Sequence, residues 1–467
     1  MSDGGGRGRA TPEVLAWARR KGELPLAAGR AIESFYDFLR DPRSRRVCTG
    51  TACRFAAGYV APAAADAAPV HCLGRCYEAP SRTDTAAGPI PRRALLAEPI
   101  VLRHLLGAAR PDLAALYAPH PADEILARLD ASGLRGRGGA AYPTGAKWAT
   151  ARRTVAPRRY VVANGDEGDP GSYVDRLLLE EDPHAVLAGM CACARAIDAS
   201  HGIVYVRAEY PAAAARVREA IAEAEAADVL PDGFTIEVHV GAGAYVCGEE
   251  TALLRSLEGL RGEAQPRPPY PAERGLHGMP TVVQNVETLA VVPWVVATGR
   301  RPDCKAMSLS GAVASPGVVE VGFGTTLAEL LAVGAGGPAP GRRFGLALVG
   351  GPMGRVIPAA DFASTVLGYD TLPAMGHGGV VVLDDTVRPA DLARHLFGFA
   401  VAESCGACTP CRVGTAQLAS RRDRADLERL LDTLELGSLC GFGQGVPRPI
   451  RDLVALAGDA LFAEVAS

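Results

Sequence analysis

The sequence has no long apolar run, few aromatic residues and no excess of charge of either sign. Aromatic residues make up only 6% of the 467 residues and the formal net charge is −3, so nothing favours a nucleic-acid binder. The longest apolar stretches, residues 185–197 and 289–297, are shorter than the roughly 18 residues of a membrane-spanning helix. We expect two buried helices there, no direct membrane insertion and, because no apolar segment follows the basic N-terminal residues, a cytoplasmic location.

The chain is long and rich in hydrophobic residues and cysteines. Its length predicts about two to four domains, and 48% hydrophobic residues can fill their cores. It also has twelve cysteines, which in a reducing compartment are more often metal ligands or catalytic groups than disulfides. Two tight groups contain Cys48, Cys53, Cys72 and Cys76, and Cys405, Cys408, Cys411 and Cys440.

The pattern of apolar residues changes along the chain. Short apolar runs at 160–163, 202–206 and 234–240 alternate with helical patterns such as 212–226, which predicts an α/β sheet. Residues 305–385 predict a small β-grasp-type α+β unit, with strands at 307–310, 317–321, 344–349 and 379–383 and a helix at 327–333. Residues 11–40 and those from 389 onward have helical patterns.

A glycine-rich segment spans residues 133–148 and includes Gly136, Arg137, Gly138 and Lys147. Its glycines let the backbone approach a ligand, its N–H groups and a following helix N-terminus favour an anion, and Lys147 adds a full charge. A P-loop is excluded because Ala146 and Trp148 flank Lys147, and the dinucleotide fingerprint is not matched. A phosphate-bearing cofactor fits the segment, with an ordinary surface loop as the alternative.

Two further polar segments follow predicted strands. The first, residues 164–171, brings Asn164, Asp166 and Glu167 to a sheet end, where α/β folds bind ligands; the alternative is an acidic turn. The second, residues 241–251, ends in Glu249 and Glu250. These two acids open a helix, so capping is their simplest role.

The C-terminal cysteines have the spacing C-x₂-C-x₂-C, and Cys440 follows at a distance. Four thiolates can bind a [4Fe–4S] cluster or a structural zinc. Three consecutive ligands at this spacing favour iron–sulfur. Outside the two groups, Cys191, Cys193 and Cys304 are expected to be structural, as small buried hydrophobic residues.

The glycine-rich segment, the Asn164 segment, the Glu249 segment and residues 284–288 together resemble the NADH-binding flavoprotein subunit of respiratory complex I and the diaphorase subunits of soluble NAD-linked hydrogenases and formate dehydrogenases. The resemblance implies FMN, a [4Fe–4S] cluster and NAD(H) as substrate. It implies that Glu249 and Glu250 lie where the nicotinamide approaches. It places the following residues around FMN or the nucleotide: Gly136, Arg137, Gly138, Gly139, Tyr142, Lys147, Asn164, Asp166, Glu167, Gly168, Tyr245, Gly248, Glu249, Glu250, Gln284, Asn285 and Thr288.

The resemblance also implies a domain order. Residues 1–90 form a trimmed thioredoxin-like region whose Cys48, Cys53, Cys72 and Cys76 hold a [2Fe–2S] cluster, with a zinc site or an empty remnant as alternatives. Residues 91–302 form a Rossmann-like FMN/NADH domain, 303–387 a β-grasp domain that is structural or contacts a partner, and 388–467 a helical bundle with the [4Fe–4S] cluster. The fold class is therefore multidomain α/β.

Three positions differ from the residues that the family usually has. Tyr142 keeps an aromatic face for stacking on adenine, but the second stacking position is Thr150, and Asp169 replaces a longer Glu. The implied function is hydride transfer between NAD(H) and FMN, in a formate dehydrogenase complex. The expected partners are a ferredoxin-like [2Fe–2S] subunit and a catalytic molybdenum or hydrogenase subunit. An NAD-linked hydrogenase and a zinc-binding interaction scaffold are the alternatives.

Overall fold

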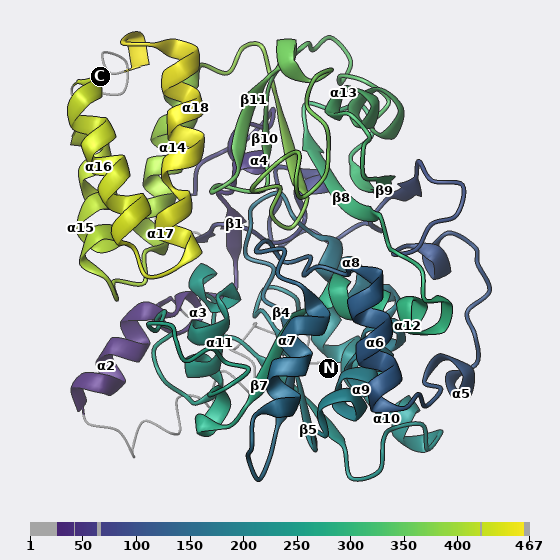
Figure 1. Cartoon of the computed structure of the whole chain (residues 1–467). Helices are drawn as coiled ribbons and strands as arrows, with labels where there is room; N and C mark the ends of the chain where they lie inside the picture. Colours follow the sequence, from purple (N-terminus) through teal and green to yellow (C-terminus); the bar gives the residue numbers. More distant parts are fainter. Residues whose placement is uncertain (1–25, 42, 63–66, 421–422, 462–467) are drawn as a thin grey trace, which may run out of the picture.

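The computed structural model describes residues 26–41, 43–62, 67–420 and 423–461 (Figure 1). The predicted helix over 11–40 therefore lies partly outside the described residues. Within them, residues 26–40 form α2 (Leu26–Phe35) and α3 (Asp37–Arg40). No helix in these ranges has the length and apolar character needed to cross a membrane.

The α/β sheet is four-stranded and entirely parallel, in the order β6-β5-β4-β7. Its strands are β4 (Tyr160–Gly165), β5 (His201–Val206), β6 (Thr235–Val240) and β7 (Thr281–Asn285). Between these strands lie α8 (Val174–Glu181), α9 (Pro183–Ile197), α10 (Pro211–Ala226) and α11 (Glu250–Leu257). Helices α6 (Ala122–Ser132) and α7 (Thr144–Arg153) precede β4, and α12 (Val286–Thr298) follows β7. The three predicted strands and the two predicted apolar helices are confirmed.

Alternate residues of the central strand face different partners, as the period of a strand requires. Val161 and Ala163 pack in the core that holds α9 and α12, whereas Tyr160 and Val162 pack with Ile32 of α2 and with α11. Helices α9 and α12 lie side by side, and Gly189 permits this approach because a Cβ there would lie 2.1 Å from Leu289 O. Both faces of the sheet are thus covered, so the place left for a ligand is at the ends of the strands.

A second, six-stranded sheet has the order β11-β10-β12-β8-β9-β3. Its strands are β3 (Arg92–Ala94), β8 (Cys304–Gly311), β9 (Gly317–Gly322), β10 (Phe344–Val349), β11 (Arg355–Pro358) and β12 (Gly379–Asp384). The four predicted strands are present, and the predicted helix is α13 (Leu327–Glu329) continued by a π-helical turn, Leu330–Gly334. Strand β3 precedes the α/β sheet in sequence but pairs in parallel with β9 at the edge of this sheet.

The C-terminal cysteine-bearing region lies beside the six-stranded sheet, whereas residues 46–48 of the N-terminal one appear in the centre of the view (Figure 1). The N-terminal one contains a two-stranded parallel sheet of β1 (Arg46–Cys48) and β2 (Ala68–Val70), with α4 (Thr51–Arg54) between them. The C-terminal one is helical, with α14 (Pro389–Glu403), α15 (Thr409–Gln417), α16 (Arg424–Gly437), α17 (Gly441–Gly445) and α18 (Pro447–Ala457). The helical C-terminal region predicted from the sequence is confirmed.

Candidate functional site

Two asparagines lie at the ends of neighbouring strands of the parallel sheet. Asn164 is the last residue but one of β4 and is paired in register with Asn285, the last residue of β7. Asn164 Nδ2 donates to Gly248 O at 2.9 Å, and Asn285 Nδ2 donates to Asp175 Oδ2 at 2.6 Å. Segments that are far apart in sequence are therefore joined at the carboxyl edge of the sheet, where α/β folds bind ligands.

The glycine-rich loop lies on this edge. Arg137 N–H donates to Thr288 Oγ1 at 2.8 Å, and Gly136 N–H donates to Tyr142 O at 2.8 Å. A Cβ on Gly138 would lie 3.0 Å from Asn285 Cβ, so this position accepts no side chain without a shift. Helix α7 follows at Thr144, and the predicted loop-to-helix transition is confirmed.

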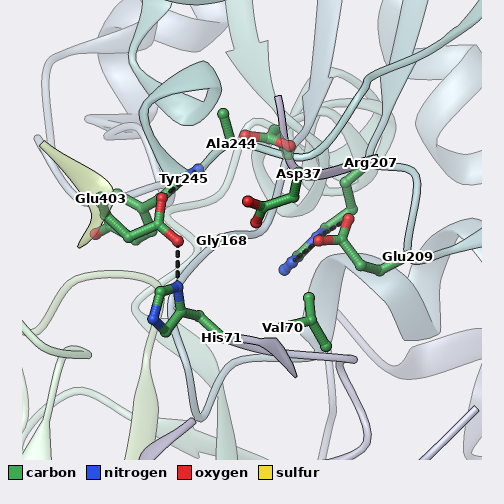
Figure 2. Close-up of a pocket in the computed structure, with 10 residues that line it drawn as sticks. Asp37, Val70, His71, Gly168, Arg207, Glu209, Ala244, Tyr245 and Glu403 are labelled. Carbon is green, nitrogen blue, oxygen red and sulfur yellow. Dashed lines mark hydrogen bonds and ion pairs between the residues drawn. The ribbon is translucent and has the colours of Figure 1, made fainter. Parts of the chain in front are cut away.

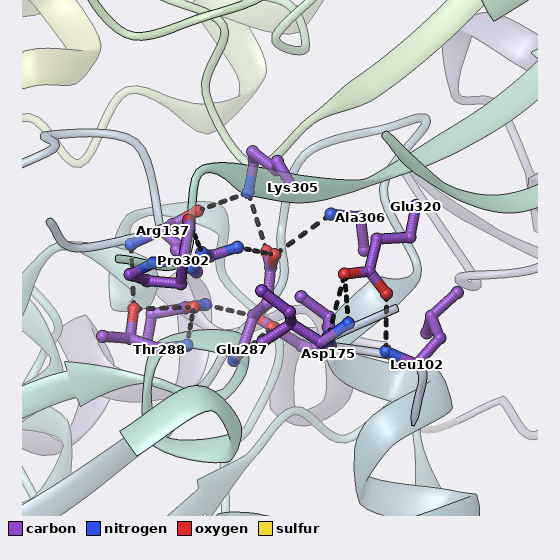
Figure 3. Close-up of polar contacts among 12 residues, drawn as sticks. Leu102, Arg137, Asp175, Glu287, Thr288, Pro302, Lys305, Ala306 and Glu320 are labelled. Carbon is purple, nitrogen blue, oxygen red and sulfur yellow. Dashed lines mark hydrogen bonds and ion pairs between the residues drawn. The ribbon is translucent and has the colours of Figure 1, made fainter. Parts of the chain in front are cut away.

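The Arg137 side chain turns away from the loop into a buried ion network (Figure 3). Its guanidinium donates to Glu287 Oε1 at 2.8 Å and to Pro302 O at 3.0 Å. Lys305 of β8 donates to Glu287 Oε2 at 2.7 Å and to Arg137 O at 3.0 Å. Arg137 was predicted to lie around FMN; its guanidinium is bound to Glu287, and its backbone is the part that lies on the glycine-rich loop.

Asp166 and Glu167 differ in how their carboxylates are used. Asp166 is buried, its Oδ2 has no hydrogen-bond partner among the described residues, and burial raises its pKa to about 8. Glu167 accepts from the N–H groups of Asp175 and Arg176 at 3.2 and 3.0 Å, at the start of α8. An unpaired buried oxygen needs a donor, and a flavin ribityl hydroxyl supplies one. The residues present therefore fit FMN at Asp166, whereas Glu167 anchors the loop.

Tyr245 connects this loop to the C-terminal helices. Its hydroxyl donates to Asp169 Oδ1, and a Cβ on Gly168 would lie 2.9 Å from its ring. The same ring packs against Phe399 and Phe442, with centroids 5.2 and 5.5 Å away. Residues Tyr245–Gly248 form a short 3-10 segment whose Val246 packs with Cys405.

Glu249 and Glu250 have separate roles at the start of α11. Glu249 accepts from the N–H groups of Thr251 and Ala252, both at 3.0 Å, so the capping role is confirmed. Glu250 lies between two cations, 2.9 Å from Arg267 Nη1 and 3.4 Å from Lys147 Nζ. Lys147 is therefore on the Glu250 side of the site.

The aromatic positions also differ from each other. Tyr142 is 53% exposed, as a stacking surface requires. Thr150 Oγ1 donates to Ala146 O of its own helix at 3.0 Å and presents no ring. Gln284 accepts from Trp148 Nε1 at 3.3 Å, which fixes α7 to β7.

The C-terminal cysteines lie next to the segment Tyr245–Gly248. Cys405, Cys411 and Cys440 are buried and Cys408 is half-buried. Burial, together with the neighbouring thiols, raises the pKa of Cys411 to about 12, and burial with nearby Glu249 and Cys405 raises the pKa of Cys440 to about 11. Such thiols bind iron only as they lose their protons. Their mutual proximity and chemistry fit a [4Fe–4S] cluster.

The N-terminal cysteines are also brought together. Cys72 Sγ lies 3.6 Å from Cys76 Sγ, and Cys48, Cys53 and Val70 pack in one buried cluster. Backbone N–H groups of Gly74 and Ser81 donate to Cys72 and Cys53 Sγ at 3.3 and 3.4 Å. No group of three or more His, Cys, Asp or Glu side chains in the described ranges is arranged to hold a single metal ion. A cluster separates its ligands more widely because several irons and sulfides lie between them.

A small polar pocket lies between the N-terminal cysteine region, the loops at the carboxyl ends of the parallel strands and the end of helix α14 (Figure 2). His71, next to Cys72, pairs through Nδ1 with Glu403, which also accepts from Tyr245 N–H at 3.1 Å. Arg207 donates to both Glu167 O and Cys72 O. Both cysteine groups are therefore connected through hydrogen bonds to the loops that carry Glu167 and Tyr245.

Three polar residues of the site were not predicted. Asp175 binds Asn285, Arg267 binds Glu250, and His377 faces the glycine-rich loop. Asp175 and Arg267 lie near predicted motifs in sequence, but their contacts depend on tertiary structure. His377 belongs to the other sheet and had no local signal.

Comparisons with known proteins agree with this geometry. Residues 129–294 match the model of the Nuo51 FMN-binding domain, and 391–460 match the NADH-ubiquinone oxidoreductase-F iron-sulfur binding region. The F 2 subunit of NADH-quinone oxidoreductase from Rhizobium meliloti (strain 1021) is 39% identical over 76% of this chain and 94% of its own length. The HndC subunit of the NADP-reducing hydrogenase from Solidesulfovibrio fructosivorans is 40% identical over 72% of this chain and 75% of its own.

Among solved structures, a chain of NAD⁺-reducing [NiFe]-hydrogenase in the H₂-reduced state matches with a TM-score of 0.83 and 33% identity. The match covers 98% of this chain and 90% of that one. The chain belongs to the family of NADH-quinone oxidoreductase F subunits and is an NAD(H)-linked oxidoreductase component that binds FMN and a [4Fe–4S] cluster.

Proposed function

We propose that this chain is the NADH-oxidising or NAD⁺-reducing module of a cytoplasmic electron-transfer complex. One observation supports it most: the segment Tyr245–Gly248 packs on the Asp166–Asp169 loop and on Cys405 at the same time. A flavin held at that loop would be separated from the iron–sulfur ligands by this single layer of residues.

FMN, when bound, supplies the hydride chemistry and the change from two-electron to one-electron transfer. The protein positions the reactants. Asp166 offers its unpaired oxygen to the flavin, and the Gly136–Gly139 backbone allows close approach. Lys147, Arg267 and Glu250 form a charged group for the nucleotide, and Tyr142 offers an exposed ring for the adenine.

We also propose that the N-terminal cysteines hold a [2Fe–2S] cluster. The support is that all four are buried and two of them accept backbone N–H groups, which stabilises thiolate charge. Iron analysis together with EPR of the reduced chain tests this. A single type of cluster signal and about four irons per chain, the content of one [4Fe–4S] cluster, would contradict it.

For the complex, we propose an NAD-dependent formate dehydrogenase with a ferredoxin-like [2Fe–2S] subunit and a molybdenum subunit. The Asn164–Gly171 loop supports the soluble-dehydrogenase branch. A hydrogenase partner is the second candidate, because the match to NAD⁺-reducing hydrogenase extends over 98% of the chain. Co-purification with associated subunits, followed by NAD⁺ reduction with formate or with H₂, separates them.

The first experiment is an anaerobic UV–visible titration of the purified chain with NADH. We expect bleaching of the flavin band followed by loss of the broad iron–sulfur absorbance. A flavin that bleaches while the iron–sulfur absorbance persists would contradict electron transfer between the two sites.

A further inference from the structure

His377 reaches the glycine-rich loop from the six-stranded sheet. It lies in the turn before β12, where Gly378 has φ 85° and its N–H donates to Met375 O at 3.0 Å. Gly378 O accepts from Ser308 N–H of β8 at 2.9 Å. The turn is therefore fixed to two strands, and the imidazole has a defined position.

The two ring nitrogens face different parts of the proposed flavin site. Nε2 lies 3.2 Å from the place that a Cβ on Gly138 would occupy, and Nδ1 lies 3.5 Å from Asp169 Oδ2. Nδ1 is buried and has no hydrogen-bond partner within the described part of the chain. The ring thus stands between the glycine-rich loop and the loop that carries Asp166 and Asp169.

Other cations beside the glycine-rich loop are bound to carboxylates at hydrogen-bonding or ion-pair distance. Arg137 and Lys305 bind Glu287, and Lys147 binds Glu250. His377 has a longer contact, 3.5 Å from Nδ1 to Asp169 Oδ2, and Asp169 also accepts from the Tyr245 hydroxyl. The other ring nitrogen of His377 stays directed at the Gly138 position of the loop.

The imidazole is charged at neutral pH. Burial lowers the pKa of His377, but the carboxylates of Asp169, Asp175 and Glu167 outweigh burial and raise it to about 9. A preorganised cation in a site shielded from water stabilises negative charge that develops there. Hydride transfer from NADH moves one proton and two electrons, so one negative charge is added at the flavin and NAD⁺ is formed.

We propose that His377 is a cofactor-contacting residue whose imidazolium, above Gly138, makes the site bind reduced FMN more tightly than oxidised FMN and so raises the flavin reduction potential. The inference rests on the proposed flavin site at the glycine-rich loop. It also makes the β-grasp-type sheet a part of the redox site, whereas the sequence had suggested a structural or partner-contacting role.

The test is the two-electron midpoint potential of FMN in the full chain, measured by anaerobic spectroelectrochemistry, with FMN content measured in parallel. His377→Gln removes the charge at similar size. We expect it to keep FMN and to weaken binding of the reduced relative to the oxidised form about tenfold, which lowers a two-electron potential by about 30 mV. His377→Lys should restore the potential. His201→Gln, which alters the first residue of β5 at the amino-terminal ends of the parallel strands, should leave the potential unchanged.

An unchanged potential in a flavin-loaded His377→Gln variant would overturn the inference and leave the flavin site intact. Equal weakening of both flavin forms would also overturn it, because that result indicates packing and not charge. Gly138→Val tests the site itself. If this variant bound FMN as tightly as the wild type, the proposed location of the flavin would be wrong, and the role of His377 with it.

Discussion

Lys305 donates a hydrogen bond of 2.7 Å to Glu287, and both side chains are almost completely removed from solvent. Lys305 belongs to β8 of the six-stranded sheet, whereas Glu287 belongs to the first turn of α12 beside the flavin loop. This ion pair therefore fixes the two sheets to each other at the proposed cofactor site (Figure 3).

Removing one member of this pair should destabilise the protein strongly. Lys305→Met leaves Glu287 buried with one cation fewer, and losing a partner of a buried ion pair costs about 3–5 kcal/mol. The measurement is the free energy of unfolding by urea. Arg301→Met is the matched control, because its pair with Asp303 is exposed and such pairs contribute about 0–1 kcal/mol. Equal effects of the two substitutions would show that the buried pair is not a special anchor.

The same network predicts sensitivity to acid. Burial raises the pKa of Glu287, but Lys305 and Arg137 outweigh it, so the pKa in the folded state lies below the ordinary value of 4.5. The stabilisation is complete above that value and is lost as the pH falls through the folded pKa. Glu287→Gln should flatten the loss of stability below pH 4.5. An unchanged acid profile in this variant would argue against the linkage.

The two neighbouring acids of α11 should respond differently to substitution. Glu250→Gln removes the charge between Lys147 and Arg267, so we expect a changed KM for NADH with FMN retained. Glu249→Ala should alter nucleotide affinity too. It also removes the N-cap of α11, so it should lower the free energy of unfolding by about 1 kcal/mol. Steady-state kinetics, flavin content and thermal unfolding distinguish them. Loss of flavin from a folded Glu250→Gln variant would contradict its assignment to the nucleotide.

Adding the missing ring at position 150 should strengthen nucleotide binding. The Thr150 hydroxyl donates to Ala146 O of its own helix, and the Tyr142 ring is exposed. An aromatic pair contributes about 0.5–1.5 kcal/mol beyond burial, so Thr150→Phe should lower the Kd for NADH about two- to tenfold. Thr150→Leu provides the matched apolar control. If Leu improved binding as much as Phe, stacking would not be the cause.

The C-terminal cysteines should be needed for onward electron transfer but not for flavin reduction. Cys408→Ser should lose the [4Fe–4S] absorbance while NADH still bleaches the flavin. Cys191→Ala is the control, because Cys191 is a buried thiol of α9 whose pKa burial raises to about 12. Stopped-flow absorbance under anaerobic conditions reads both steps. A Cys408→Ser variant with an intact iron–sulfur spectrum would exclude this cysteine as a ligand.

The predictability of the fold depended on element length and regularity. Strands β4, β5 and β10 and helices α9 and α10 were predicted because their apolar patterns are long and regular. Strand β3 was missed because it has three residues, two of them arginine, and its partner β9 is distant in sequence. The predicted helix over 327–333 changes into a π-helical turn because Ala335 N–H bonds back to Leu330 O, five residues earlier.

The grouping of the candidate site residues could be predicted as far as their motifs are continuous in sequence. Asn164, Gly138 and Asn285 lie together as expected. The direction of a long side chain was not predictable: Arg137 turns to Glu287, and Lys147 turns to Glu250. His377 could not be predicted, because only the packing of one sheet against the other brings it to Gly138.

The pairing of β3 with β9 also affects how the chain can assemble during synthesis. Domains generally fold as units as they leave the ribosome. Strand β3 leaves before the whole parallel sheet, but its hydrogen-bonding partner leaves after that sheet. The pairing of β3 with β9 can therefore form only after all residues of the parallel sheet have been synthesised. In a nascent chain that stops before β9, β3 is left without its partner strand.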